Sequence, residues 1–156
     1  MLRAQHAIAF ALSHLSFSAT CAGDCLLGFG LPAGELEYLD KAISIDPKEF
    51  TLLHLRGRFT FEVATLSWIE KKVCNALFST LPDASIDMAL KDFHEADRHV
   101  PFVWAENLLY LARCYSIKKD KANAQKYIDM VEAIENKDDM VIESLTEIKA
   151  LIAKCK

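Results

Sequence analysis

Two histidines in this sequence stand in surroundings typical of a zinc-binding helix. His94 and His99 flank Glu95 and Asp97, and some metalloproteases hold zinc with two histidines and an intervening glutamate on one helix. That chemistry needs the histidines four residues apart, so that both lie on one helical face. Here they are five apart, which separates them by about 140° around the helix axis. We therefore expect a solvated polar face here and no metal site.

The five cysteines are the other residues that could bind a metal or form disulfides. Cys21 and Cys25 can share one helical face, but no second pair lies near them in the sequence, so their spacing does not predict a zinc site. The odd number and scattered positions predict no disulfide framework. Free cysteines are commonly small, buried, apolar residues. Reduced thiols are typical of the cytosol, where we expect the protein to be.

Patterns that would indicate an enzyme or a nucleic-acid-binding protein are also lacking. Gly28 and Gly30 alone are too short a motif for a phosphate-binding loop, and no nucleophile, base and acid can be grouped from the sequence. The net charge is -4, which provides no basic excess for nucleic acid. We expect a non-enzymatic protein that needs no cofactor.

The elements that position any binding residues are expected to be helices. Apolar residues make up 52% of the chain, and only 5 glycines and 4 prolines are present, too few turn-formers for an all-β fold. Apolar side chains recur at spacings of three and four. Ser85 and Asp120 are suitable N-caps, and a kink is expected near Gly57 or Ser67. The expected helices span residues 4–17, 35–45, 50–80, 88–99, 104–116, 122–134 and 139–154.

Three of these helices repeat one packing pattern. Ala89, Phe93 and Ala96 are followed by Pro101, an order typical of the second helix of a tetratricopeptide repeat. An ordinary helical bundle can contain one such match by chance, but the pattern recurs in frame. The two further copies are Leu39, Ala42 and Pro47, and Ala124, Ile128 and Val131.

The spacing of the copies predicts an insertion. Ala42 and Ala96 are 54 residues apart and Ala96 and Val131 are 35 apart, against a usual period of about 34. About 20 extra residues therefore lie within 50–80. We expect an all-α fold of tetratricopeptide-like helical hairpins with one extended insert helix. A C-terminal helix should cap the stack with a stripe formed by Val141, Leu145, Ile148, Ile152 and Cys155.

One distinctive stretch carries a family resemblance. It runs from Leu55 to Val73, with Trp68 at its centre, and is followed by an exit at residues 77–82. Together with residues 42–48 and 107–111, this stretch resembles the regulator of microtubule dynamics family, whose members carry a tetratricopeptide-like domain. The exit has one proline, Pro82, where the family has two. The resemblance covers roughly residues 35–131. It implies a cytoplasmic, non-enzymatic scaffold that binds proteins and is associated with microtubules and the mitotic spindle.

Two arginines are placed to bind a partner. Arg58 follows Gly57, and Arg113 follows Ala112. In the tetratricopeptide repeats that the chain resembles, the neighbour of this small residue faces the concave side. Two guanidinium groups there suit a carboxylate or an acidic peptide, because each can form a bidentate, charge-assisted contact.

The alternative is that both arginines pair with carboxylates of neighbouring helices, such as Glu62 or Glu106, and only hold the stack together. The candidate groove residues share helical faces at spacings of three and four; they are His54, Arg58, Phe61, Leu109 and Arg113.

Charge favours one side of the chain for a direct tubulin contact. Residues 56–72 sum to +2, whereas residues 83–97 sum to -4. Because tubulin surfaces are acidic, the second stretch should repel a microtubule at low salt. The candidates on the basic side are Arg56, Lys71 and Lys72.

The sequence also gives expectations for the N-terminal stretch and for the limits of the domain. The apolar run after Arg3 resembles a signal peptide in part, but His14 and two serines interrupt it, so a buried helix is favoured. We expect a single tetratricopeptide-like domain over residues 1–156 that begins inside the family's domain. The alternative function is an apolar-ligand or lipid-binding helical module at organelle contact sites, with a cavity between the N-terminal helices and the insert.

Overall fold

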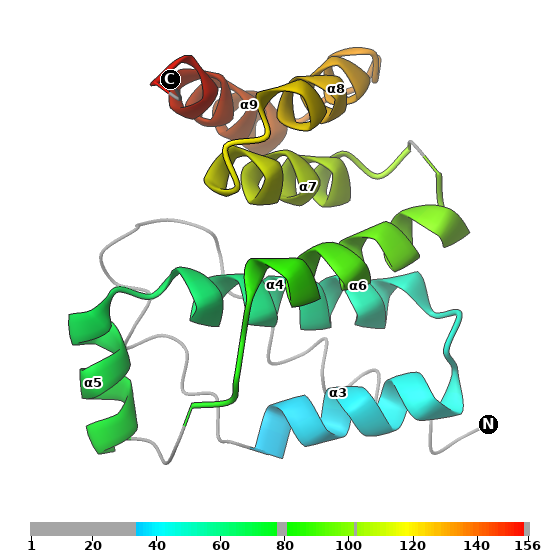
Figure 1. Ribbon diagram of the computed structural model, residues 1–156. Helices are drawn as coiled ribbons and strands as arrows, with labels where there is room; N and C mark the ends of the chain where they lie inside the picture. Colours follow the sequence, from blue (N-terminus) through cyan, green and yellow to red (C-terminus); the bar gives the residue numbers. More distant parts are fainter. Residues whose placement is uncertain (1–33, 78–80, 102, 155–156) are drawn as a thin grey trace.

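The computed structural model describes residues 34–77, 81–101 and 103–154 (Figure 1). These residues form helices, with no strand among them, as the sequence predicts. The expected helix at 4–17 lies outside the described residues, as do Cys21 and Cys25. The helices are α3 (Gly34–Ile45), α4 (Phe50–Thr65), α5 (Trp68–Leu77), α6 (Ile86–His99), α7 (Ala105–Ile117), α8 (Lys121–Glu132) and α9 (Asp139–Lys154).

Side-chain caps fix where several helices begin. The Ser85 hydroxyl accepts a hydrogen bond from the Met88 backbone N–H at α6, and the Asp120 carboxylate accepts one from the N–H of Asn123 at α8. Both caps confirm the sequence prediction, since small polar residues satisfy the unpaired N–H groups of a first turn.

The described part of segment 50–80 is helical apart from one short break, as the sequence predicts. It contains α4 and α5, and the chain turns sharply between them (Figure 1). The break falls at Ser67, one of the two predicted kink positions. The Ser67 N–H donates to Glu70 Oε2 over 2.6 Å, and the Glu70 N–H donates to Ser67 Oγ over 3.3 Å. This reciprocal pair is a capping box, which starts a new helix.

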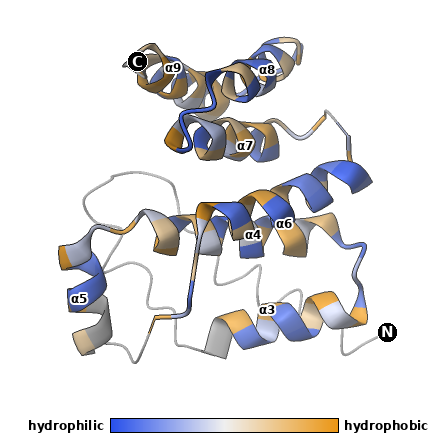
Figure 2. Cartoon of the chain, viewed as in Figure 1, coloured by the Kyte–Doolittle hydropathy of each residue, from blue (hydrophilic) through white to orange (hydrophobic). Residues whose placement is uncertain are grey.

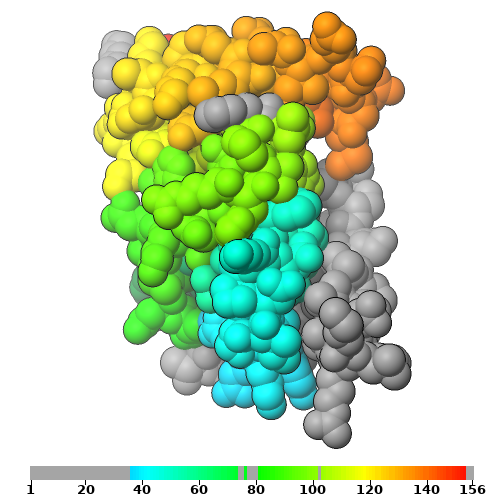
Figure 3. Space-filling view, turned by 90° about the vertical axis from the view of Figure 1, so that its right-hand side faces the viewer, coloured from blue at the N-terminus to red at the C-terminus, as the bar shows by residue number. Residues whose placement is uncertain are grey.

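In Figure 3 the colours run from cyan at the bottom to orange at the top, so the chain progresses along the molecule from α3 and α4 towards α8. α4 packs along α6 and α7 along α8, while α6 meets α7 and α3 packs on α4. α5 therefore lies between the two members of the α4–α6 hairpin in sequence, outside their contact. Apolar and polar residues alternate along each helix (Figure 2), and the largest core cluster joins side chains of α4 and α6 to those of α7, α8 and α9.

The apolar residues that define the repeat pattern lie in the core, whereas its prolines, Pro47 and Pro101, are exposed. Every alanine, leucine, phenylalanine, isoleucine and valine of the three copies is buried. Gly57 shows why a small residue is needed where α4 crosses α6. A Cβ at Gly57 would lie 2.8 Å from Cε1 of Phe93, closer than carbon atoms pack.

The C-terminal helix α9 packs against α7 and α8. Leu145, Ile148 and Ile152 are buried, and Val141 packs at the edge of the same core. The expected stripe is thus present in its described members, while Cys155 lies outside the described residues. Within the described ranges, none of the helices has the length and apolar character needed to cross a membrane.

Candidate functional site

Arg56 and Arg58 leave α4 on opposite sides. They are two residues apart in a helix that turns by about 100° per residue, so their side chains diverge by about 200°. Gly57 lies between them and allows the close approach to Phe93. The two guanidinium groups therefore enter two separate clusters, one on each side of the α4–α6 crossing.

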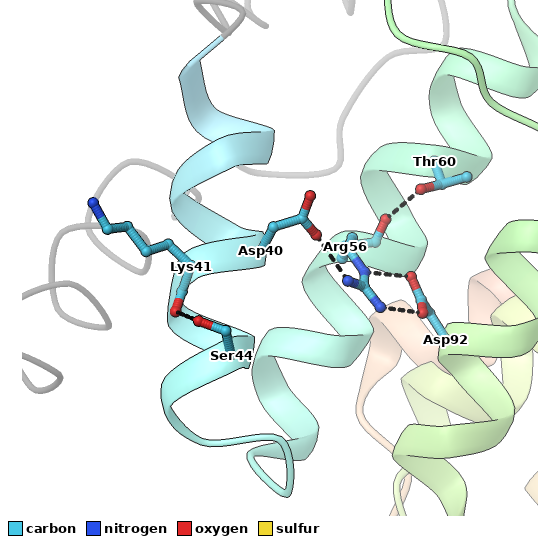
Figure 4. Close-up of polar contacts among 6 residues, drawn as sticks. All are labelled: Asp40, Lys41, Ser44, Arg56, Thr60 and Asp92. Carbon is cyan, nitrogen blue, oxygen red and sulfur yellow. Dashed lines mark hydrogen bonds and ion pairs between the residues drawn. The ribbon is translucent and has the colours of Figure 1, made fainter.

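Arg56 is held by two carboxylates (Figure 4). Its Nε and Nη2 donate to the two oxygens of Asp92 over 2.8 and 2.7 Å, and Nη1 donates to Asp40 Oδ1 over 2.8 Å. Asp92 raises the pKa of Arg56 above its ordinary value, although burial acts in the opposite direction. The guanidinium therefore ties α3, α4 and α6 together.

This arrangement corrects the placement of Arg56 among basic residues facing a partner. Three of its N–H groups are already used, so its charge is neutralised within the fold. The bidentate contact with the buried Asp92 is the strongest geometry that a guanidinium and a carboxylate can adopt. Arg56 is a structural residue in this conformation.

Arg58 and Arg113 converge on one aromatic ring. The Cζ atoms of the two arginines lie 5.5 and 5.3 Å from the centroid of Tyr110, a distance at which a cation is attracted to the ring. The side chains of Arg58 and Arg113 are 28% and 26% exposed. We call Arg58, Tyr110 and Arg113 the arginine–tyrosine cluster. The structure brings together the two arginines that the sequence predicts to share a site.

Both arginines also have carboxylate neighbours, as the alternative interpretation requires. Arg58 Nη1 donates to Glu106 Oε1 over 3.0 Å. Arg113 Nη2 lies 3.6 Å from Glu147 Oε2 and 3.4 Å from Ser144 Oγ, both on α9. Glu147 is 63% exposed, and exposed pairs contribute little to stability. These contacts are weaker than those of Arg56, and they leave both guanidinium groups accessible.

The pKa values of two glutamates beside the cluster are shifted in opposite directions. Burial raises the pKa of Glu62, although the charges of Arg58 and Arg113 oppose that shift. The pKa of Glu106 lies below its ordinary value because His54 and the two arginines favour its charged form, with His54 the largest cause. Glu106 is therefore the firmly ionised carboxylate of the site.

His54 lies in the core and not on the predicted groove. It is 1% exposed, with the rings of Trp104, Phe93 and Tyr110 at 4.2, 5.5 and 5.6 Å. Its Nδ1 is 2.9 Å from Asn107 Oδ1. Asn107 was not among the predicted site residues. The signal that could have revealed it is a polar residue on a helix face that is otherwise apolar.

Phe61 and Leu109 are also placed differently from the prediction. Both are buried, and Phe61 packs edge-on against Tyr110 at 5.4 Å. Their helical faces point into the α4–α6–α7 core, because α7 packs closely on the α4–α6 hairpin. Of the five groove candidates, Arg58 and Arg113 are the ones that reach the surface.

The comparisons with known proteins agree with the sequence resemblance. A family described as Regulator of microtubule dynamics protein 1-3 matches residues 36–156. The chain belongs to the regulator of microtubule dynamics family. The match includes both arginine clusters and all the described helices except the first two residues of α3.

Individual members of the regulator of microtubule dynamics family match over part of their length. Regulator of microtubule dynamics protein 1 of Caenorhabditis elegans is 40% identical over 119 residues, which is 76% of this chain and 52% of the relative. Human protein 2 is 38% identical over 94 residues, covering 60% of this chain and 23% of the relative. Rat protein 3 is 30% identical over 121 residues, covering 76% and 26%. The chain thus spans about half of the nematode relative.

In this family member, α5 carries the other predicted basic residues. Lys72 Nζ lies 4.0 Å from the ring centroid of Trp68, a cation–π contact on the surface. Lys71 is partly exposed. Trp68 and Ile69 are 69% and 67% exposed, so α5 presents an amphipathic surface with two lysines.

The acidic stretch 83–97 is less repulsive than its sequence suggests. Asp92 is neutralised by Arg56, Asp87 forms an ion pair with Lys118, and Glu95 pairs with Arg98. The formal sum over the stretch therefore overstates its field, because three of its negative charges pair with cations that lie outside residues 83–97.

Among the described residues, no group of three or more histidine, cysteine, aspartate or glutamate side chains is placed to hold a metal ion. His94 Nε2 is 2.9 Å from the Tyr115 hydroxyl, whereas His99 lies beside Glu95. Burial raises the pKa of the Cys114 thiol to about 12, which makes this thiol unreactive. Two surface hollows in the described ranges, one along α8 and one between its C-terminal end and Val103, are open to solvent. The predicted lipid cavity involves residues 1–33, outside the described part.

Proposed function

We propose that the chain is a non-enzymatic, cytoplasmic interaction module of a protein associated with microtubules and the mitotic spindle, and that the arginine–tyrosine cluster binds an acidic peptide segment. The observation that carries the peptide site is the convergence of two partly exposed guanidinium groups on Tyr110. The microtubule role is supported by family membership and by the names of the relatives.

The geometry suits carboxylate ligands for two reasons. Arg58 and Arg113 belong to α4 and α7, which are packed elements, so their backbones are fixed before a ligand arrives. Arg58 has N–H groups beyond the one that contacts Glu106, and Arg113 has N–H groups beyond the one that contacts Ser144 and Glu147. A planar fork of donors matches a carboxylate. The Tyr110 ring holds both guanidinium groups through cation–π contacts.

A binding measurement tests the peptide site. The probe is a fluorescent octaglutamate peptide, titrated with the chain at low and moderate salt. The double variant Arg58→Glu with Arg113→Glu should weaken binding at least about tenfold, because two charge-assisted contacts are lost. Arg58→Lys with Arg113→Lys keeps the charge and should give an intermediate loss, because lysine lacks the planar fork.

The matched control reverses two charges elsewhere. Arg98→Glu with Lys121→Glu changes the net charge equally at exposed positions and should bind the peptide nearly as well as the unchanged chain. Thermal unfolding by circular dichroism checks that each variant is folded. If Arg98→Glu with Lys121→Glu lost as much peptide affinity as Arg58→Glu with Arg113→Glu, the effect would be nonspecific and would contradict the site.

We propose α5 as the surface for direct microtubule contact. Lys71 and Lys72 on α5 are the remaining candidates of the basic side, because the third candidate, Arg56 on α4, is engaged by Asp40 and Asp92. Co-sedimentation with microtubules over a salt series tests this. Lys71→Glu with Lys72→Glu should reduce binding at low salt, where exposed charges are least screened, whereas Lys41→Glu with Lys121→Glu should not. Unchanged binding of the first variant would remove α5 from the interface.

A further inference from the structure

His54 has a ring nitrogen without a hydrogen-bond partner although the side chain is almost fully buried. Asn107 Nδ2 donates to the carbonyl oxygen of Phe93 over 3.0 Å, so Asn107 Oδ1 is the atom that faces His54. An oxygen there requires that His54 Nδ1 carry a hydrogen. In the neutral ring, Nε2 is therefore a bare acceptor, which is costly in a buried place.

The group that faces Nε2 is another acceptor. Glu106 Oε1 lies 3.7 Å from His54 Nε2, and the same oxygen accepts the hydrogen bond of Arg58. Arg58 lies one helical turn after His54 on α4. From α7 the neighbouring titratable groups are Glu106 and Tyr110, and from α6 the ring of Phe93, which does not titrate, packs on His54. The oxygen Oε1 of Glu106 thus accepts a hydrogen bond from Arg58 and also faces the ring nitrogen of His54 that has no hydrogen-bond partner.

We propose that His54 and Glu106 couple the acidic-peptide site to protonation, so that an acidic ligand binds Arg58 with uptake of one proton by His54. This inference rests on the proposed function. With Nε2 protonated, His54 becomes a donor to Glu106. The positive charge of His54 then balances the Glu106 carboxylate in place of Arg58. A ligand carboxylate then takes the place of Glu106 on the Arg58 guanidinium.

The proton balance is simple. The proton comes from solvent and forms one N–H bond at Nε2; no other covalent bond is made or broken. Glu106 stays ionised throughout, because the pKa of a glutamate lies well below pH 6 and that of Glu106 is lowered further. The incoming carboxylate adds one negative charge, and the proton on His54 compensates it. Histidine is suited to this role because it changes charge between pH 5 and 8.

Isothermal titration calorimetry with the octaglutamate peptide tests the coupling. At pH 7, titrations in phosphate and in Tris differ in enthalpy by the number of protons taken up multiplied by the difference in buffer ionisation enthalpy. We expect net proton uptake by the unchanged chain, and an affinity that falls about tenfold between pH 6 and pH 8. The peptide carboxylates remain ionised over this range.

Glu106→Gln is the decisive variant, because Glu106 lies near the surface and the substitution keeps its shape. The amide can donate to neutral His54 and still accept from Arg58, so binding should continue without proton uptake and with little pH dependence. His54→Gln should likewise remove the uptake, and His99→Gln, at a partly exposed surface position, should keep it.

The outcomes separate the two proposals. Binding that depends on Arg58 and Arg113 but takes up no proton would overturn the coupling and leave the peptide site standing. Proton uptake that persists in Glu106→Gln would also overturn the coupling. No binding at pH 6 or pH 7 would overturn both.

Discussion

Arg56 and Arg58 are two residues apart on α4, yet the fold uses their charges in different ways. Arg56 is fixed by the buried Asp92 and by Asp40. Arg58 has one carboxylate partner, Glu106, and the oxygen of Glu106 that it contacts also faces His54. The difference shows that a guanidinium becomes structural when two carboxylates, one of them buried, use most of its donors. It stays available for a ligand when its partner is half exposed.

The largest effect should come from removing the buried partner of Arg56. Asp92→Ala leaves that guanidinium without its bidentate contact and should lower the free energy of unfolding by about 2–3 kcal/mol, near the lower end for breaking a buried pair. Glu106→Ala should cost under about 1 kcal/mol, because its pair with Arg58 is partly solvated. Urea unfolding of both variants checks this. Equal losses would mean that the two clusters are energetically alike.

The next effect concerns the glycine that separates the two arginines. Gly57→Ala places a methyl group against Phe93, and this overpacking should cost about 1–3 kcal/mol. The higher helix propensity of alanine offsets about 1 kcal/mol of it. A net loss of up to about 2 kcal/mol is expected in urea unfolding. A stabilised Gly57→Ala protein would show that α4 and α6 can separate without penalty.

The two glutamates beside Arg58 should give opposite pH dependences. The pKa of Glu62 is raised in the fold, so its contribution to stability is fully present below its ordinary pKa and is lost as the pH rises through the raised value. The pKa of Glu106 is lowered, so its contribution is present above the ordinary pKa and is lost as the pH falls through the lowered value.

Glu62→Gln should therefore stabilise the protein at pH 7, whereas Glu106→Gln should destabilise it there, each by less than about 1 kcal/mol. Urea unfolding at pH 7 and pH 4 measures both differences, and both should shrink at pH 4. Shifts of the same sign would mean that the two carboxylates have similar surroundings.

The smallest effect is a control away from both arginines. Lys119 in the turn between α7 and α8 has a φ of 60°, a conformation that glycine adopts more readily than lysine. Lys119→Gly should stabilise the protein by about 0.5 kcal/mol, because relief of strain outweighs the added freedom of the unfolded chain. Its thermal melt should shift without any change in peptide binding.

The sequence predicted most of the fold because its signals are local. Ser85 and Asp120 cap the helices that they were expected to cap, and the repeat positions are buried. The insert is helical as predicted, but the apolar spacing continues through Ser67 and did not decide between the two expected kink positions. The capping box there depends on the pairing of Ser67 with Glu70, which outweighs a continuous pattern.

The candidate site was harder to predict because it depends on contacts between helices. The sequence placed Arg58 and Arg113 together, but it also put His54, Phe61 and Leu109 on the groove. Helical spacing tells which residues share a face, and it does not tell which face another helix will cover. Arg56 was read as free for the same reason, since Asp92 lies 36 residues away in the sequence.

The position of α5 between the members of a hairpin has a consequence for folding. Three residues join α7 to α8, whereas twenty lie between the end of α4 and the start of α6. Closing the longer connection costs about 1–2 kcal/mol more chain entropy in a simple loop estimate. We expect α7 and α8 to pair early and the α4–α6 contact to form later. Synthesis runs in the other direction, so on the ribosome α4 emerges before α6 and Asp92 are available to pack against it.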